Sequence, residues 1–192
     1  MNLINRIKSI LITPKTEWTV IEPEETDPKT LTVSYLIPLA LISAIATFIG
    51  FGLIGQTYFG VHVGSVGLGL RHAIISLVST VGGAFLMAWI IDLLASSFGS
   101  EKNFKQSFKL VVYSYTPMLV AGILFIIPSL AVLVSLAGLY GLYIMYLGLQ
   151  PLKKTPDDKK VTYFVVSLVV VLIGTFALSA ILTSIFLTAS LF

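Results

Sequence analysis

Long apolar runs alternate with short polar stretches along this chain of 192 residues. A helix needs about 20 apolar residues to cross the hydrocarbon core of a bilayer. Five runs are about this long, and the polar stretches between them are too short to form another domain. The pattern predicts an all-α, polytopic integral membrane protein whose five transmembrane helices cover about 33–53, 73–95, 110–127, 130–149 and 163–187.

The first 30 residues have a different pattern and predict a separate amphipathic segment. Apolar side chains recur at helical spacing over residues 2–12, while Asn5, Arg6 and Lys8 lie off that stripe. This pattern favours a short helix on the membrane surface, and the alternative is a loosely ordered N-terminus. The acidic, proline-containing stretch 22–29 is expected to be a solvated loop. The chain thus divides into a cytoplasmic segment, 1–30, and a transmembrane domain, 31–192.

The composition agrees with a membrane protein. Charged residues make up 11% of the chain, hydrophobic residues 56%, and the mean hydropathy is +0.97. A soluble domain carries about twice that fraction of charge. The chain has no cysteine, which excludes disulfides and thiolate chemistry.

The positive charges predict the orientation. Eleven of the twelve Lys and Arg residues fall in the N-terminal segment and in the second and fourth loops, and only Arg71 lies in the first loop. Five spans place those eleven on one side, which the positive-inside rule makes cytoplasmic. We therefore expect a multi-pass protein of the cell inner membrane with its N-terminus in the cytoplasm and its C-terminus outside.

The connection from Gly55 to Gly69 is uncharged and rich in glycine, and its glycine spacing matches no phosphate-binding motif. We expect a flexible or interfacial loop. His62 and His72 have no carboxylate or cysteine nearby in the sequence, so no metal site is predicted.

The third span contains the most distinctive chemistry. Pro117 lacks an N–H, so the carbonyl of Tyr113 loses its helical partner and needs another donor in lipid. We expect a bend, with a hydroxyl of the same helix or a side chain of a neighbouring span as the donor. The second span carries the lone acid Asp92, expected either to reach the headgroups or to pair with Lys109 or Tyr113. The candidate polar cluster is therefore Asp92, Lys109, Tyr113, Ser114, Tyr115 and Pro117.

Basic and aromatic residues next to the spans are candidates for contacts with lipid headgroups. Tryptophan favours the headgroup level, and lysine and arginine favour anionic lipid. These candidates are Arg6, Lys8, Trp18, Lys153 and Lys154.

The motifs around the third span resemble those of the Yip family, which carries the Ypt/Rab-interacting-protein domain. They are Phe98-Gly99, Phe104-Lys105-Gln106 and the run from Tyr113 to Pro117; Pro14 followed by Trp18 and Ile21 also fits. The resemblance implies five spans and a cytoplasmic N-terminus. Eukaryotic members have Asp-Leu-Tyr-Gly-Pro before the first span, where this chain has Thr32 to Pro38. The chain therefore looks like the compact bacterial members, and a Rab-type GTPase is not an expected partner.

The sequence favours a non-enzymatic adaptor or membrane-organising factor that binds partner proteins or lipids. The spans lack the residues for a catalytic triad or a carboxylate pair, and no cofactor or nucleic acid is expected. The expected partners are membrane lipids and other membrane proteins, including further copies of the chain. The alternative is a small transporter or channel-like protein with a polar path around Asp92, Tyr113 and the Pro117 kink.

Overall fold

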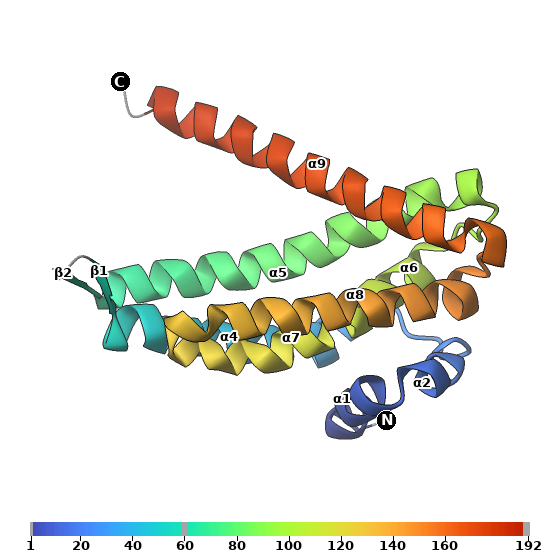
Figure 1. The fold of residues 1–192 in the computed structure, drawn as a ribbon, viewed down its shortest axis with the longest axis horizontal. Helices are drawn as coiled ribbons and strands as arrows, with labels where there is room; N and C mark the ends of the chain where they lie inside the picture. Colours follow the sequence, from blue (N-terminus) through green and yellow to red (C-terminus); the bar gives the residue numbers. More distant parts are fainter. Residues whose placement is uncertain (1, 59–60, 190–192) are drawn as a thin grey trace.

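The computed structural model describes residues 2–58 and 61–189, with side chains over 2–56 and 62–174. Figure 1 shows long helices running side by side along the longest axis, with the N-terminal helices against one flank. Within the described residues, four helical segments are long and apolar enough to cross a membrane: Pro28–Ile54, Val66–Phe98, Phe104–Ile126 and Pro128–Lys153. The all-α, multi-pass fold is therefore confirmed.

The first of these segments changes its helical pitch twice. Its parts are α3 (Pro28–Leu31), a π-helix (Thr32–Leu36), α4 (Ile37–Phe48) and a second π-helix (Ile49–Ile54). In the first π-helix the N–H of Ile37 bonds to the carbonyl of Thr32, immediately before Pro38. Pro38 cannot donate a bond, and the wider turn before it accommodates that loss.

A short hairpin follows, made of β1 (Gln56–Tyr58) and β2 (Val61–Val63). The strands are antiparallel, with Thr57 opposite His62. Gly55 begins the hairpin at φ +71°, a conformation that favours glycine. The connection expected over 55–69 as a flexible or interfacial loop is therefore shorter than predicted and begins with this hairpin, because α5 already starts at Val66.

The chain then returns in long helices. These are α5 (Val66–Ala95), α6 (Phe104–Ser114), α7 (Thr116–Ala121), α8 (Ala131–Lys153) and α9 (Asp157–Ala189), joined by 3₁₀ turns at Ser96–Phe98, Gly122–Ile126 and Pro128–Leu130. α9 packs against α5 and α8, where the Tyr163 hydroxyl donates to the carbonyl of Ile91. The expected fifth span, 163–187, extends past the side chains that the structure describes and stays a prediction.

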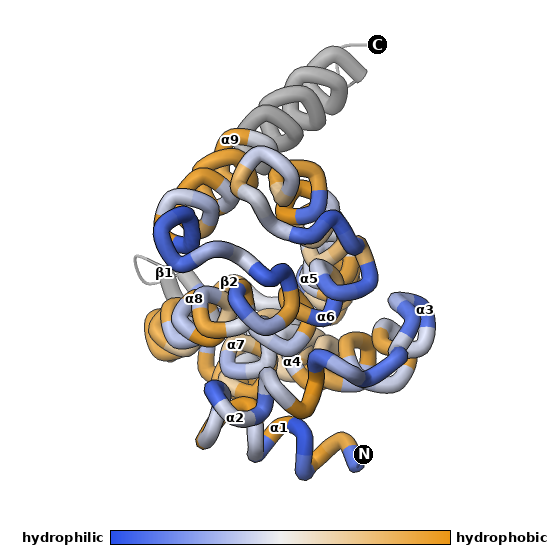
Figure 2. The backbone as a smooth tube through the Cα atoms, turned by 90° about the vertical axis from the view of Figure 1, so that its right-hand side faces the viewer, coloured by the Kyte–Doolittle hydropathy of each residue, from blue (hydrophilic) through white to orange (hydrophobic). Residues whose placement is uncertain are grey.

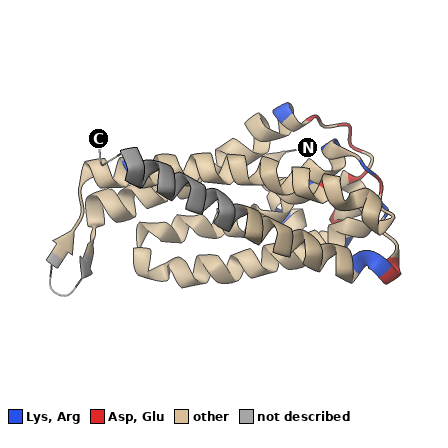
Figure 3. Cartoon of the chain, turned by 90° about the horizontal axis from the view of Figure 1, so that it is seen from above, with Lys and Arg blue, Asp and Glu red and all other residues tan. Residues whose placement is uncertain are grey.

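Charged residues gather at one end of the bundle (Figure 3). The N-terminal helices α1 (Leu3–Ile12) and α2 (Pro14–Ile21) pack there, and the loops before α6 and α9 meet there. Figure 2 looks onto this end and shows the hydrophilic loops gathered on it. We call it the charged end.

Candidate functional site

Arg6 joins the N-terminal segment to the bundle. Its guanidinium pairs with Glu17 of α2 at 2.5 Å and with Glu24 in the linker between α2 and α3. It also lies over the ring of Tyr113, 5.4 Å from the centroid. Only 4% of Arg6 is exposed, so the expectation of a headgroup contact is corrected. A buried cation needs anionic partners, and α2 and the linker supply both.

Trp18 is likewise buried in the bundle, where the sequence suggested a headgroup contact. Its indole N–H donates to the carbonyl of Ile144 in α8 at 3.0 Å. Gly148, one turn further along α8, makes room for the ring, because a Cβ there would lie 2.7 Å from Trp18 Cε2. The indole therefore fills a notch in α8 that only glycine leaves open.

The side chain of Lys109 holds the linker by bonding to the backbone carbonyls of the linker. Its ammonium donates to the carbonyls of Ile21, Glu22 and Glu24 at 3.0, 3.2 and 2.7 Å. The amide of Gln106 donates to the same Glu22 carbonyl at 3.0 Å. Side chains of α6 thus fix the path of the linker through bonds to its main chain.

Asp92 has a different partner from either of the two expected. Its carboxylate accepts from the ammonium of Lys153 at 2.9 Å and from the hydroxyl of Ser107 at 3.1 Å. Lys153 is fully buried and also donates to the carbonyl of Asn103 at 3.3 Å. The hypothesis of a pair with Lys109 or Tyr113 is therefore wrong, and so is the expected headgroup contact of Lys153. The ion pair instead joins α5 to α8, with α6 between them.

The third span is interrupted where the proline predicts. α6 ends at Ser114 and α7 begins at Thr116. The Thr116 hydroxyl donates to the Tyr113 carbonyl at 2.6 Å, which confirms that a hydroxyl of this helix replaces the lost N–H. Since the Thr116 proton is used there, the hydroxyl of Tyr35 donates to Thr116 Oγ1 at 2.8 Å. One hydroxyl chain therefore links the first and third spans.

Replacing Thr116 by valine tests these two linked hydrogen bonds. Valine keeps the shape and removes the hydroxyl, so both the Tyr113 carbonyl and the Tyr35 hydroxyl lose a buried partner. We expect a loss of about 1–3 kcal/mol in the free energy of unfolding, measured in detergent. Thr19→Val, at an exposed position on α2, is the control and should change little. Equal stability of both variants would contradict the role of the hydroxyl.

The remaining candidates lie apart from one another. Lys8 and Lys154 are exposed, and Lys154 pairs with Glu101 at 2.8 Å, a contact that raises the pKa of Lys154. Ser114 is buried, and its hydroxyl has no hydrogen-bond partner among the described residues. The hydroxyl of Tyr115 contacts Met87 Sδ at 3.7 Å. The candidate polar cluster is therefore divided among several separate contacts.

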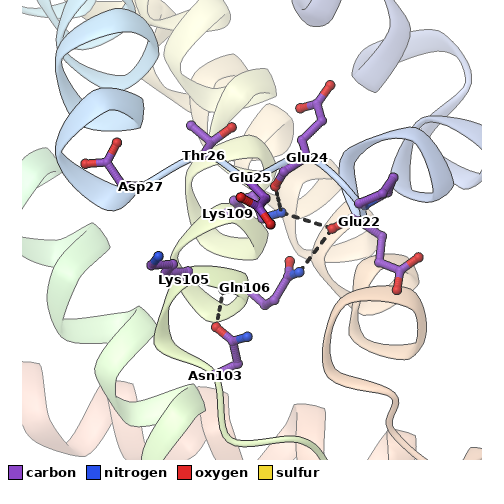
Figure 4. Close-up of a pocket in the computed structure, with 10 residues that line it drawn as sticks. Glu22, Glu24, Glu25, Thr26, Asp27, Asn103, Lys105, Gln106 and Lys109 are labelled. Atoms are coloured by element: carbon purple, nitrogen blue, oxygen red, sulfur yellow. Dashed lines mark hydrogen bonds between the residues drawn. The ribbon is translucent and has the colours of Figure 1, made fainter.

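A hollow of about 520 Å³ opens at the charged end between the linker and the start of α6. Figure 4 shows the linker above and α6 below, with Gln106 and Lys109 reaching up to the linker carbonyls. Acidic side chains of the linker, Glu22, Glu25 and Asp27, face the hollow together with Lys105. Both charge signs are thus presented on one open surface.

Several of these residues escaped the sequence analysis. Glu17 and Glu24 carry no local signal, because their partner Arg6 is eleven and eighteen residues away on another element. Ser107 carries no local signal for its contact with Asp92 either, because residues two apart on a helix point to different sides and Lys109 bonds to the linker instead. Gly148 carries no signal of its own, because its role depends on the Trp18 ring of a distant helix.

The comparison with known proteins agrees with the motifs. A family model described as the Yip1 domain matches residues 8–181, a range that begins within α1 after Arg6 and includes the other residues of the site. No curated protein and no solved structure matches the chain. Proteins of this family are generally non-catalytic membrane proteins. The chain belongs to the Yip family.

Proposed function

We propose that the protein is a non-enzymatic adaptor that docks a cytosolic protein at the charged end of its bundle. The hollow between the linker and α6 carries this proposal, because it is open and lined by side chains of both signs. Its walls are also braced: Lys109 and Gln106 hold the linker, and Arg6 ties Glu24 to the N-terminal helices. A braced surface loses little conformational entropy when a partner binds.

The orientation needed for this role follows from the positive charges. Eleven of the twelve Lys and Arg residues precede the first span or lie in the second and fourth loops. The positive-inside rule then puts the charged end in the cytoplasm of a cell bounded by an inner membrane. With a fifth span in α9, the C-terminus lies outside.

The contacts of the buried polar residues favour an adaptor over a transporter. Asp92 is hydrogen-bonded to Lys153 and Ser107, and Lys109 is hydrogen-bonded to three backbone carbonyls. Both contacts lie at the same end of the bundle. The cavity of about 300 Å³ that Ser114 and Tyr115 border further along is lined mainly by apolar side chains such as Met118 and Leu142. A polar route needs groups at successive depths, and these residues do not supply one.

Site-specific photocrosslinking in cells tests the proposal. A photoreactive residue at Lys105, exposed beside the hollow, should form discrete adducts with a cytosolic protein. The same residue at Val63, exposed at the far end of the bundle, is the control and should form none. The charge reversal Glu22→Lys should weaken the adduct at position 105 if the charges of the hollow select the partner.

Two outcomes would contradict the adaptor role. One is that position 105 yields only lipid adducts or none. The other is that purified protein in liposomes conducts an ion or solute at a rate that Asp92→Asn abolishes, which would favour the transporter.

A further inference from the structure

A second cavity, of about 400 Å³, lies between the linker and helix α1. Its walls come from α1, the linker, the first π-helix and α6. The polar residues lining it are Arg6, Glu24, Glu25, Thr26, Ser34, Tyr35 and Tyr113. Leu3 and Leu31 add apolar surface. The cavity is therefore amphipathic. It shares the linker residues Glu24, Glu25 and Thr26 with the hollow proposed for protein docking, and its other walls are different.

The hydroxyl of Tyr113 has no hydrogen-bond partner among the described residues, although only 4% of the residue is exposed. Its oxygen is not fully enclosed and is therefore open to whatever occupies the cavity, where a tyrosine hydroxyl favours a polar partner. The neighbouring Tyr35 hydroxyl is already used on Thr116. Tyr113 thus brings an unused donor and acceptor to the wall of this cavity.

The charges around the cavity are unbalanced. Arg6 is neutralised by two carboxylates, those of Glu17 and Glu24. Glu25 also lines the cavity, is exposed, and forms no ion pair in the described part of the chain. The ammonium of Lys109 bonds to the backbone carbonyl of Glu24, and forms no ion pair with Glu25. The cavity therefore favours a ligand that carries a positive charge.

The surroundings of the cavity indicate a ligand that comes from the membrane. Ile4 neighbours Leu3 on α1 and is 70% exposed, and Val33 neighbours Ser34 on the opposite wall and is 62% exposed. Large apolar side chains exposed on both sides of a polar opening are expected at the boundary between headgroups and acyl chains. Tyr113 lies one helical turn further into the third span than Lys109, which fits this depth.

We propose that this cavity binds the headgroup of an aminophospholipid such as phosphatidylethanolamine. Its ammonium would pair with Glu25, and a phosphate or ester oxygen would accept a bond from the Tyr113 hydroxyl. The acyl chains would extend past Ile4 and Val33 into the bilayer. A choline headgroup lacks N–H donors and is bulkier, so it should bind more weakly.

Native mass spectrometry of the purified full chain tests this binding. Phosphatidylethanolamine added to the detergent-solubilised protein should stay bound at energies that remove phosphatidylcholine and phosphatidylglycerol. Tyr113→Phe and Glu25→Gln should each lower its retention about tenfold, the effect of one lost hydrogen bond to a charged group. The matched controls are Tyr143→Phe and Asp158→Asn, a partly exposed tyrosine and an exposed acid away from the cavity. Neither control should change retention.

Further measurements separate the source of the ligand and the fold of the variants. Soluble phosphoethanolamine carries the same polar groups without acyl chains, and displacement of the lipid by an equal concentration of it would overturn the membrane source. Thermal unfolding shows whether each variant stays folded. If Tyr113→Phe does not fold, the test rests on Glu25→Gln, which changes an exposed position. Equal retention of the ethanolamine and choline lipids, or retention unchanged by Glu25→Gln, would overturn the proposal. Tyr113 lines this cavity and not the docking hollow, and Glu22 and Lys105 line the hollow and not this cavity. Lipid retention in Tyr113→Phe and crosslinking at Lys105 are therefore read independently, and the adaptor role can fail while this site stands.

Discussion

Replacing Asp92 by alanine is expected to lower the free energy of unfolding by about 3–5 kcal/mol, because it leaves a buried ammonium without its counter-ion. Lys153 is fully buried, and Asp92 is its only ion-pair partner among the described residues. Asp92→Asn should cost less, since the amide oxygen can still accept from Lys153 and Ser107. Unfolding in detergent, followed by circular dichroism, measures both changes.

The ion pair can be separated from the rest of the site by a double substitution. Replacing both partners with apolar residues, Asp92→Leu with Lys153→Met, removes the buried charges together and should recover much of the stability lost by Asp92→Ala. Lys154→Gln is the matched control: it removes the neighbouring lysine, whose pair with Glu101 is exposed, and should leave stability unchanged. The model of a single buried pair would fail if the double variant were as unstable as the sum of its single variants.

Replacing Trp18 by alanine is expected to detach the N-terminal helices from the bundle. The substitution empties a fully buried site and removes the bond to the Ile144 carbonyl. Truncating a buried tryptophan costs about 3–5 kcal/mol, and here the loss falls mainly on the docking of α1 and α2. Limited proteolysis in the linker, at Glu22 to Asp27, should become at least about tenfold faster.

Filling the notch at Gly148 of α8 should also detach the N-terminal helices. In Gly148→Leu the new side chain would occupy the place of the Trp18 ring, with its Cβ 2.5 Å from Leu110 Cδ1 and 2.7 Å from Trp18 Cε2. Gly82→Leu is the control, because a Cβ at that glycine of α5 meets nothing within 4 Å. The docking model would be refuted if Gly148→Leu left cleavage of the linker as slow as in the unmodified protein.

Local chemistry in the sequence predicted the fold and part of the site. Apolar runs of bilayer length predict helices because a backbone in lipid must satisfy its own hydrogen bonds. The substitute donor for the Tyr113 carbonyl was also predictable, because Thr116 is only three residues away. These inferences needed no knowledge of how one helix packs on another.

The partners of Asp92, Arg6 and Trp18 depend on that packing. Asp92 and Lys153 are 61 residues apart, and their contact requires the depth and rotation of two long helices. Arg6 lies off the apolar stripe of its own helix, so a surface position was the natural prediction until the carboxylates of Glu17 and Glu24 were placed around it. Composition and periodicity do not contain this information.

The way in which Lys109 holds the linker has a consequence for how this protein can evolve. Its three bonds go to backbone carbonyls, which every amino acid supplies. Side chains such as Pro23 and Thr26 can therefore be exchanged without loss of the anchor, while Lys109 itself cannot. Descendants of one ancestral chain can thus acquire new binding specificities by changing the linker sequence and keep the same scaffold beneath it.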